Sequence, residues 1–182
     1  MADERKGAKE KILHAADEIA REAGPSNLSL DAVALRAGVS KGGLLYHFPS
    51  KAKLLEAVVE SHLRAFDASL TALERQRAGE ANCLIEAYLD LFPHERTKKK
   101  PPPAAILAAL AENPDLMAPV RRYERCLLDR MKKNASDPAM AMVAFLALHG
   151  AQNMAMLKLD ILDEDELDVA LKRIRECIKV AD

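Results

Sequence analysis

The stretch that decides the fold is "AGVSKGGLLYHF", which runs from Ala37 to Phe48. It reads as a short helix in which two adjacent glycines, Gly42 and Gly43, follow a lysine. Each glycine inside a helix costs about 0.5–1 kcal/mol relative to alanine, so the sequence gives up helix stability at two positions. A helix start without side chains, next to a cation, suggests that another molecule approaches this backbone closely.

The residues just before the glycines complete a pattern of two short helices joined by a tight turn. Ser29 is a good N-cap for a helix over Leu30–Arg36, because its hydroxyl can accept a backbone N–H of the first turn. Gly38 supplies the turn, and Ser40 caps a further helix that ends near Phe48. A short helix, a glycine turn and a second short helix form a helix-turn-helix.

A helix-turn-helix that binds DNA places the N-terminal end of its second helix in the major groove. There, Lys41 can donate to guanine, and Gly42 lets the backbone approach base edges without a Cβ in the way. Tyr46 and His47 can donate to phosphates, whereas Leu45 can either pack against a thymine methyl group or face the protein. The predicted DNA-binding residues are Ser29, Ser40, Lys41, Gly42, Gly43, Leu45, Tyr46, His47 and Lys51.

Composition supports a helical protein with a mild charge asymmetry. Hydrophobic residues make up 49% of the 182 residues but aromatic residues only 4%, which favours helices over strands. The formal net charge is −1, yet residues 1–53 contain nine Lys and Arg against seven Asp and Glu. Residues 160–168, "DILDEDELD", contain six carboxylates. A basic N-terminal segment and an acidic C-terminal segment permit nucleic-acid binding by the N-terminal segment.

Several classes of function find no support in the sequence. There is no Ser/His/Asp motif, no HExxH and no phosphate-binding glycine loop, so we do not expect an enzyme or a cofactor. The three isolated cysteines, Cys83, Cys126 and Cys177, argue against a disulfide framework or a metal site and fit a reducing cytoplasm. No apolar stretch is long enough to span a bilayer, so we expect no membrane association and a cytoplasmic location.

Helical periodicity continues through the rest of the chain, and no segment has the alternation of a strand. A first helix ends at Gly24-Pro25, and a long fourth helix follows Ser50 and ends near Gly79. A linker, "HERTKKKPPP", is expected over residues 94–103. The remaining helices are expected over residues 81–92, 104–112, 114–134, 138–159 and 164–180. The predicted fold class is therefore all-α, with about nine helices.

The segment Leu28–Val58 closely resembles the DNA-binding domain of the TetR family of transcriptional repressors. The residues that match the family pattern in register are Ala34, Ala37, Gly38, Val39, Ser40, Gly42, Leu44, His47, Phe48, Lys51 and Leu54. The resemblance covers roughly the first 60 residues. One departure is that the family usually has a tyrosine directly after Leu44, whereas this chain has Leu45 there and Tyr46 next.

The resemblance implies a two-domain homodimer that binds a palindromic operator in double-stranded DNA. It divides the chain into a helix-turn-helix domain over residues 1–53 and a helical ligand-binding and dimerisation domain over residues 54–182. The last two helices of such proteins form the dimer interface, and the segment over residues 139–157 is apolar nearly all round, as this requires. The predicted interface residues are Val143, Ala147, Gly150, Met154, Leu157, Leu167, Leu171, Ile174 and Ile178.

The resemblance also implies a small-molecule effector, bound among the middle helices, whose binding rotates the long fourth helix and releases DNA. The candidate lining is mostly apolar, which favours a lipophilic ligand. The candidate residues are Tyr88, Phe92, Met117, Tyr123, Leu127 and His149, drawn from residues 84–92, 106–110, 116–128 and 145–156. For Tyr88 and Tyr123, core packing is an equally good interpretation. For His149, a core or interface position is the commoner role.

An alternative from another class is a helical adaptor that uses its helix-turn-helix to contact a protein. The salt dependence of binding distinguishes the two functions. DNA binding releases counterions, so the affinity for DNA falls steeply as the salt concentration rises. Dimerisation that does not depend on salt, without DNA affinity, would favour the adaptor.

Overall fold

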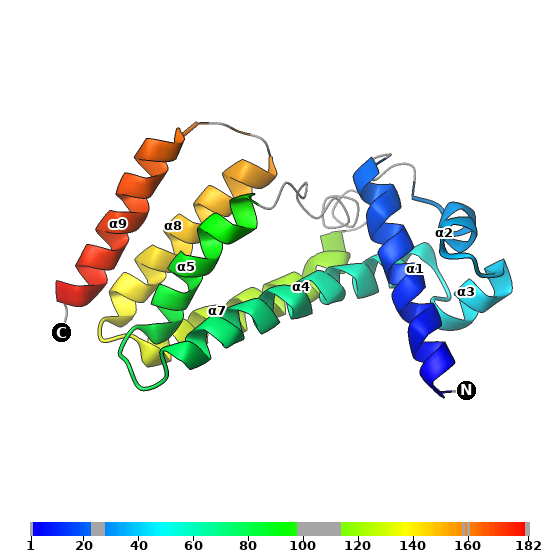
Figure 1. Cartoon of the computed structure of the whole chain (residues 1–182), viewed down its shortest axis with the longest axis horizontal. Coiled ribbons are helices and arrows are strands. Elements are labelled where there is room, and N and C mark those ends of the chain that lie inside the picture. The colour runs from blue at the N-terminus through cyan, green and yellow to red at the C-terminus, as the bar shows by residue number, and fades with distance from the viewer. Residues whose placement is uncertain (1, 23–27, 98–113, 158, 160, 181–182) are drawn as a thin grey trace. The chain divides into compact units, whose positions relative to one another are not determined.

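The computed structural model describes residues 2–22, 28–97, 114–157, 159 and 161–180 (Figure 1). This described part contains eight α-helices, one short 3-10 helix and no strand, which confirms the predicted all-α class. The chain divides into two compact units by its internal packing. Unit 1 comprises Met1–Arg64 with Pro103–Arg122, and unit 2 comprises Ala65–Pro102 with Tyr123–Asp182.

Unit 1 contains the helix-turn-helix. Its helices are α1 (Ala2–Glu22), α2 (Leu30–Ala37), α3 (Lys41–His47) and the first part of α4 (Lys51–Gln76), with the 3-10 helix η2 (Pro114–Met117). Each α-helix contributes apolar residues at helical spacing to one core, which fixes α3 against its neighbours. The largest fully buried side chains of this core are Ile12, Leu28, Leu44, Leu54 and Leu55, and the ring of Phe48 is buried beside them in the same core.

Unit 2 is a separate helical bundle. It contains the rest of α4, α5 (Cys83–Thr97), most of α7 (Ala118–Asn134), α8 (Pro138–Met156) and α9 (Glu164–Val180). Figure 1 shows α5, α8 and α9 side by side, and these three helices pack against one another. The core comes from every helix and includes Leu70, Leu84, Ile85, Tyr88, Leu127, Met131, Leu148 and Ile178.

Two predicted boundaries need correction. The structure continues α5 through Pro93 to Thr97, so residues 94–97 of the predicted linker are helical. Proline removes only one backbone donor, and the turn before it is anchored by the buried side chains of Leu91 and Phe92. Helix α8 ends at Met156 and not at residue 159. The predicted helix over residues 104–112 lies outside the described residues, whereas α9 spans the predicted range.

The division into a DNA-binding domain over residues 1–53 and a second domain over residues 54–182 stays a prediction about function. In the structure, α4 is one continuous helix. Its residues up to Arg64 pack in unit 1, and its later residues pack in unit 2.

A buried asparagine holds the start of α5 in place. Asn82 adopts a left-handed backbone conformation with φ of 60°, which asparagine tolerates better than most residues. Its side-chain amide donates to Oγ of Ser136 at 2.8 Å and to the carbonyl of Ile178 at 3.1 Å. Its Oδ1 accepts the backbone N–H of Ser136 at 3.2 Å. One side chain thereby joins the start of α5, the loop before α8 and the end of α9.

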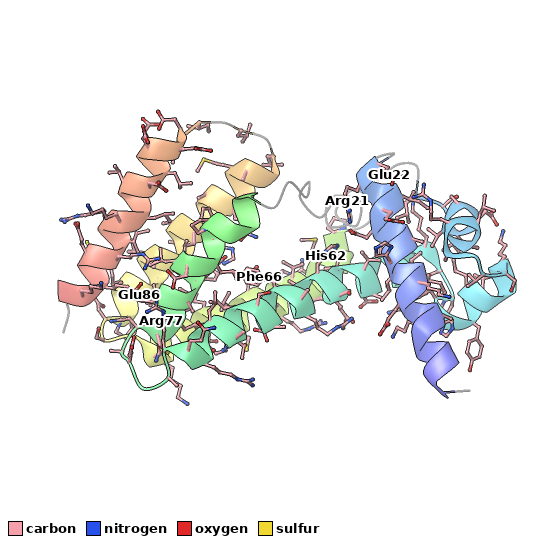
Figure 2. All side chains as sticks on the ribbon, in the orientation of Figure 1. Arg21, Glu22, His62, Phe66, Arg77 and Glu86 are labelled. Atoms are coloured by element: carbon pink, nitrogen blue, oxygen red, sulfur yellow. The ribbon has the colours of Figure 1, made fainter. Side chains whose placement is uncertain are left out.

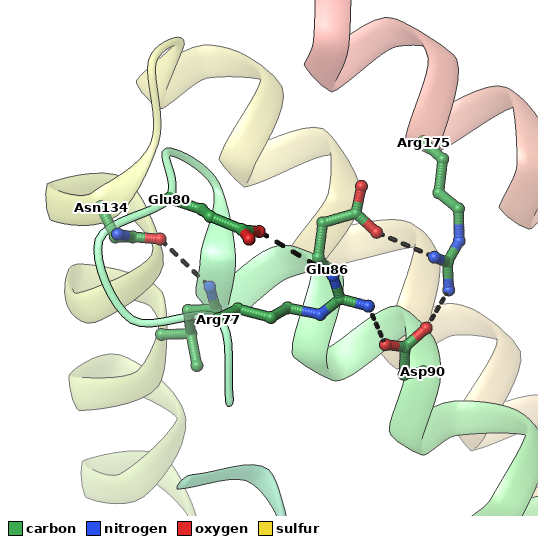
Figure 3. Close-up of polar contacts among 7 residues, drawn as sticks. Arg77, Glu80, Glu86, Asp90, Asn134 and Arg175 are labelled. Atoms are coloured by element: carbon green, nitrogen blue, oxygen red, sulfur yellow. Dashed lines mark hydrogen bonds and ion pairs between the residues drawn. The ribbon is translucent and has the colours of Figure 1, made fainter. Parts of the chain in front are cut away.

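A chain of alternating charges joins α9 to α5 and to the segment after α4 (Figure 3). Arg175 of α9 donates to Oε2 of Glu86 at 2.9 Å and to Oδ1 of Asp90 at 2.6 Å. Arg77 donates to the other Asp90 oxygen at 2.5 Å. Glu86 is buried, so Arg175 supplies the partner that this carboxylate needs when it leaves water.

Candidate nucleic-acid interface and ligand site

The turn between α2 and α3 forms as the sequence predicts. Gly38 lies in the left-handed region, with φ of 66° and ψ of 32°, where a side chain is strained. The backbone N–H of Val39 donates to the carbonyl of Ala34 at 3.0 Å and closes the end of α2. Ser29 and Ser40 are the N-caps of α2 and α3, because their Oγ atoms accept the backbone N–H groups of Ala32 and Gly43.

Helix α3 presents one face to the core and one to solvent. Leu44 and Phe48 are buried in unit 1. Lys41, Gly42, Leu45 and Tyr46 are exposed, and Tyr46 has the largest exposed fraction among the apolar residues of the helix, at 72%. Because the exposed set begins at the first residue of α3, the N-terminal end of this helix is open to a partner. Leu45 faces solvent, which leaves it free to contact that partner.

The two glycines of α3 differ in what surrounds them. A Cβ built on Gly43 would lie 3.2 Å from Oγ of Ser40, the atom that caps the helix, so the cap itself favours glycine there. A Cβ built on Gly42 would meet no described atom within 4 Å. Nothing described in the chain therefore favours glycine at position 42, although alanine would give a more stable helix.

An ion pair holds the side chain of Lys41. Its Nζ lies 2.8 Å from Oδ1 of Asp31, in the first turn of α2, and both side chains are largely exposed. A cation in the first turn of a helix is disfavoured by the helix dipole, so Asp31 offsets part of that cost. Exposed pairs of this kind contribute about 0–1 kcal/mol, which a phosphate or a base can readily replace.

Two further predicted residues, His47 and Lys51, border this surface. The imidazole of His47 is half-buried and contacts the ring of Tyr46 edge-on, with 5.3 Å between ring centroids. Lys51 is half-buried and is the first residue of α4. Ser50 caps that helix, because its Oγ accepts the backbone N–H of Lys53 at 3.2 Å. The nine predicted DNA-binding residues thus all lie in three short segments, over residues 29–32, 40–47 and 50–53.

A histidine–aspartate pair joins α1 to α4 within unit 1 (His62 is labelled in Figure 2). Nε2 of His62 lies 2.8 Å from Oδ1 of Asp17. Burial alone would raise the pKa of the Asp17 carboxyl, but the hydrogen bond and charge of His62, together with Arg21, outweigh burial and lower it. The pair therefore stabilises the contact between α1 and α4 in unit 1, the unit that contains the helix-turn-helix.

Unit 2 contains a cluster of aromatic rings that includes three of the predicted ligand residues. The ring of Phe66, labelled in Figure 2, contacts Tyr88 and Tyr123 edge-on, at 5.5 and 6.2 Å between centroids. His149 contacts Tyr88 at 5.7 Å and Phe145 at 4.1 Å. The structure therefore brings Tyr88, Tyr123 and His149 together, and it adds Phe66 and Phe145.

The prediction missed Phe66. It included Phe145 in the lining range 145–156 but did not name it among the candidate residues, although the sequence held a signal for it. Phe145 lies four residues before His149 on one helix face, a spacing that places two side chains together. Phe66 comes from a distant segment and could not be found in this way.

Polar groups border the aromatic rings. The hydroxyl of Tyr88 donates to Oε1 of Gln152 at 3.0 Å and lies 3.4 Å from Nε2 of His149. Burial, and to a smaller extent the charge of Glu124, raises the pKa of Tyr88, so the hydroxyl remains a donor. The hydroxyl of Tyr123 donates to Oδ1 of Asp67 at 3.3 Å.

Of the other predicted ligand residues, two lie in the same hydrophobic core as Tyr88. Phe92 and Leu127 are buried in the core of unit 2. Met117 belongs to η2 in unit 1, so the structure does not group it with the aromatic cluster. The predicted lining over residues 106–110 lies outside the described residues.

The predicted dimer residues fall into two groups. Val143, Ala147 and Leu157 are exposed, and Gly150 and Met154 are half-buried, so the α8 part of the prediction lies at the surface. The predicted residues of α9 pack into the core of their own unit, and their contact with a partner stays a prediction. These residues are Leu167, Leu171, Ile174 and Ile178.

Three large apolar residues that the prediction omitted are exposed on the same two helices. Met142 and Leu146 join Val143 on the open face of α8, and Leu146 is 69% exposed. Val169 is exposed on α9. We name the exposed apolar residues Met142, Val143, Leu146 and Ala147 the α8 face.

Other kinds of site find no support in the described ranges. No helix there is both long and apolar enough to cross a membrane. No group of three or more His, Cys, Asp or Glu side chains among those residues is arranged to hold a metal ion.

The geometry of α2 and α3 defines a helix-turn-helix protein. The family model described as "Bacterial regulatory proteins, tetR family" matches residues 12–58. The model described as "Tetracyclin repressor-like, C-terminal domain" matches residues 82–179, which is more than half of the chain. The chain belongs to the TetR family.

Individual relatives agree with this assignment. The HTH-type transcriptional regulator SrpR of Pseudomonas putida is 31% identical over 99 residues, which cover 54% of this chain and 46% of SrpR. The match thus spans about half the length of that relative.

Two solved structures share the fold. A TetR-family transcriptional regulator from Streptomyces coelicolor has a TM-score of 0.77 at 20% identity, covering 97% of this chain and 96% of that chain. The multidrug binding protein EbrR, complexed with malachite green, has a TM-score of 0.68 at 21% identity, covering 95% of this chain and 96% of that chain.

Proposed function

We propose that this chain is a cytoplasmic, ligand-responsive transcriptional repressor that binds a palindromic DNA operator as a homodimer through α3. One observation carries the proposal: glycine at position 42 weakens an exposed helix, and no described part of the chain requires it. A partner that approaches the backbone there explains the glycine. The major groove of DNA is such a partner, because it admits a helix by its N-terminal end and offers acceptors to Lys41.

The α8 face supports the homodimer. Met142, Val143, Leu146 and Ala147 follow one another at helical spacing and present a continuous apolar stripe to solvent. An apolar stripe of this kind is typical of an interface, and a twofold-related copy would cover it with the same residues. Dimerisation gives two copies of α3, which is what an operator with two inverted half-sites requires.

The aromatic cluster of unit 2 supports a small, lipophilic effector. Its rings offer a large apolar area, and the hydroxyl groups of Tyr88 and Tyr123 and the imidazole of His149 add a few polar groups. The related fold of EbrR binds malachite green, a precedent for an aromatic ligand on this fold. Phe66 lies on α4, and α4 also supports the helix-turn-helix, so a ligand at Phe66 acts on a helix shared by both units.

DNA binding by the full chain tests this function. The probe is the DNA upstream of the chain's own reading frame, measured by fluorescence anisotropy at two salt concentrations. We expect tight binding that weakens steeply with salt, and a large loss in the double variant Lys41→Ala/His47→Ala. Lys172→Ala, which removes an exposed charge from α9, is the control and should bind as the wild type does.

Two results would count against the proposal. The first is a double variant that binds this DNA as tightly as the wild type and with the same salt dependence. The second is a wild-type chain that dimerises but binds no sequence, either in this probe or in a random-sequence library, which would favour a protein-binding adaptor.

A further inference from the structure

Asp31 and Lys41 form an ion pair across the turn of the helix-turn-helix. Nζ of Lys41 lies 2.8 Å from Oδ1 of Asp31 and donates to Oδ2 at 3.1 Å, so both carboxylate oxygens hold the ammonium group. The side chains of Lys41 and Asp31 are 58% and 71% exposed. A molecule that reaches this surface therefore meets the pair and not a lone lysine.

The position of Asp31 opposes DNA binding by its charge. A carboxylate in the first turn of α2 suits the helix, since it complements the positive end of the helix dipole. The same short segment, over residues 29–32, also holds Ser29, a predicted DNA-binding residue. A negative charge there repels phosphates. The helix accounts for an acidic residue at this position, but a DNA-binding surface gains from it only through its contact with Lys41.

Two other cations of this region are paired in a different way. Arg36 donates to Glu22 of α1 at 2.9 Å, and Lys53 donates to Glu56 of the same helix at 2.7 Å. Neither glutamate lies in the three segments that hold the predicted DNA-binding residues. Asp31 does, and its partner is the lysine that is predicted to read a base.

The pair changes what Lys41 offers to DNA of arbitrary sequence. A free lysine is a mobile cation on a flexible stem that attracts any phosphate, and each phosphate that it neutralises releases counterions. The ammonium group of Lys41 is already neutralised by Asp31. It therefore gains little when it exchanges a carboxylate for a phosphate.

The pair leaves Lys41 able to read a base. An ammonium group has three N–H donors, and the two oxygens of Asp31 occupy at most two of them. The remaining donor can bind an acceptor on a base edge, such as O6 or N7 of guanine, while the ion pair stays intact. Asp31 also fixes the place of the ammonium group, so the side chain loses less freedom when it binds a base.

We propose that Asp31 is a positioning residue that restrains Lys41 and thereby makes the protein prefer its operator over DNA of other sequence. The inference rests on the proposed function, since it names a source of sequence preference at α3. Asp31 lowers the affinity for arbitrary DNA, because it neutralises Lys41. It maintains the affinity for the operator, because Lys41 reads a base from within the pair.

Two duplexes test the preference by fluorescence anisotropy of the full chain: the sequence most enriched from random-sequence DNA, and a scrambled duplex of the same length and composition. At about 0.1 M salt, Asp31→Asn should bind the scrambled duplex about threefold or more tightly, with a salt slope steeper by about one, because Lys41 is free to neutralise a phosphate. Its affinity for the enriched sequence should rise less, so the ratio of the two affinities should fall. Glu176→Gln removes an exposed carboxylate that pairs with Arg173 on α9, and this control for net charge should keep the wild-type ratio.

The Lys41→Ala background separates restraint of the lysine from direct repulsion of phosphates. There, Asp31→Asn should lose most of its effect on the scrambled duplex, because no lysine is left to release. An equal gain in both backgrounds would overturn the inference, since Asp31 would then act on phosphates by itself. Thermal unfolding checks that each variant folds.

The wild type distinguishes failure of this inference from failure of the proposed function. A wild-type preference for the enriched sequence that Asp31→Asn keeps in full contradicts this inference alone. A wild-type chain that prefers no sequence contradicts the proposed function and this inference with it.

Discussion

Replacing Gly42 by alanine should raise the stability of the protein and lower its affinity for DNA. The two effects have opposite signs because they have different causes. The added methyl group meets no described atom within 4 Å, so the fold gains the better helix propensity of alanine without a clash. On DNA, the same methyl group lies on the exposed start of α3, where the proposed contact requires the backbone to approach base edges or phosphates.

The magnitudes follow from the position of the residue. Gly42 lies in the first turn of α3, where the preference for alanine is at the low end of its range, so the expected gain is about 0.5 kcal/mol. For a chain of this size, that raises the midpoint of thermal unfolding by about 1–2 °C. Disturbing one good base contact costs about 1–3 kcal/mol, which is about fivefold to 150-fold in the dissociation constant.

Circular dichroism melting and fluorescence anisotropy with operator DNA measure the two effects. Gly38→Ala is the matched control, because Gly38 lies at φ of 66° and alanine there is strained by about 1–2 kcal/mol. The control should therefore lower the melting temperature. A Gly42→Ala variant that melts higher and binds DNA as tightly as the wild type would refute the argument that a partner explains this glycine.

Two further predictions concern unit 2. Arg175→Met leaves Glu86 and one oxygen of Asp90 without their partner and should cost about 1–3 kcal/mol in urea unfolding near pH 7. Burial alone would raise the pKa of Asp90, but Arg175 and Arg77 outweigh burial and lower it. The ionised carboxylate therefore stabilises the folded protein at any pH above the ordinary carboxyl pKa. This stabilisation is lost as the pH falls through the lowered pKa. The deficit of the variant should therefore shrink in acid, and a deficit that stays constant down to about pH 3 would contradict this. Leu146→Glu places a charge on the α8 face and should give a monomer in sedimentation, with weaker operator binding, whereas the conservative Leu146→Met should sediment as a dimer. Equal sedimentation of both variants as dimers would show that this face is not the interface.

The helix-turn-helix was predictable because its signals are local. Ser29, Gly38 and Ser40 each act on backbone groups within a few residues, so sequence spacing alone fixes the caps and the turn. The buried and exposed faces of α3 follow from the same spacing, because Leu44 and Phe48 lie one turn apart.

The features that were not predicted depend on contacts between distant segments. Asn82 looks like an ordinary loop residue until Ser136 and Ile178 are placed around it. Glu124 reads as one charge among many on α7, and only the packing of α8 shows that its oxygen is buried. Pro93 predicts a helix end by itself, but the buried residues before it decide otherwise.

Periodicity also cannot say which partner covers an apolar stripe. Leu167, Leu171, Ile174 and Ile178 repeat at helical spacing, and this pattern is the same whether the stripe packs within the chain or against a second copy. The structure places these four side chains inside unit 2. The proposed dimer uses the α8 face, whose apolar residues are exposed.

Selection of binding sites from random-sequence DNA by the full chain tests the central claim most directly. The account predicts that the wild type enriches a palindrome with two inverted half-sites. It also predicts that Lys41→Ala changes the base preference at one position of each half-site, because Lys41 reads a base and does not only attract phosphates. Enrichment of no sequence, or of the same sequence with the same preferences by Lys41→Ala, would contradict recognition of DNA through the N-terminal end of α3.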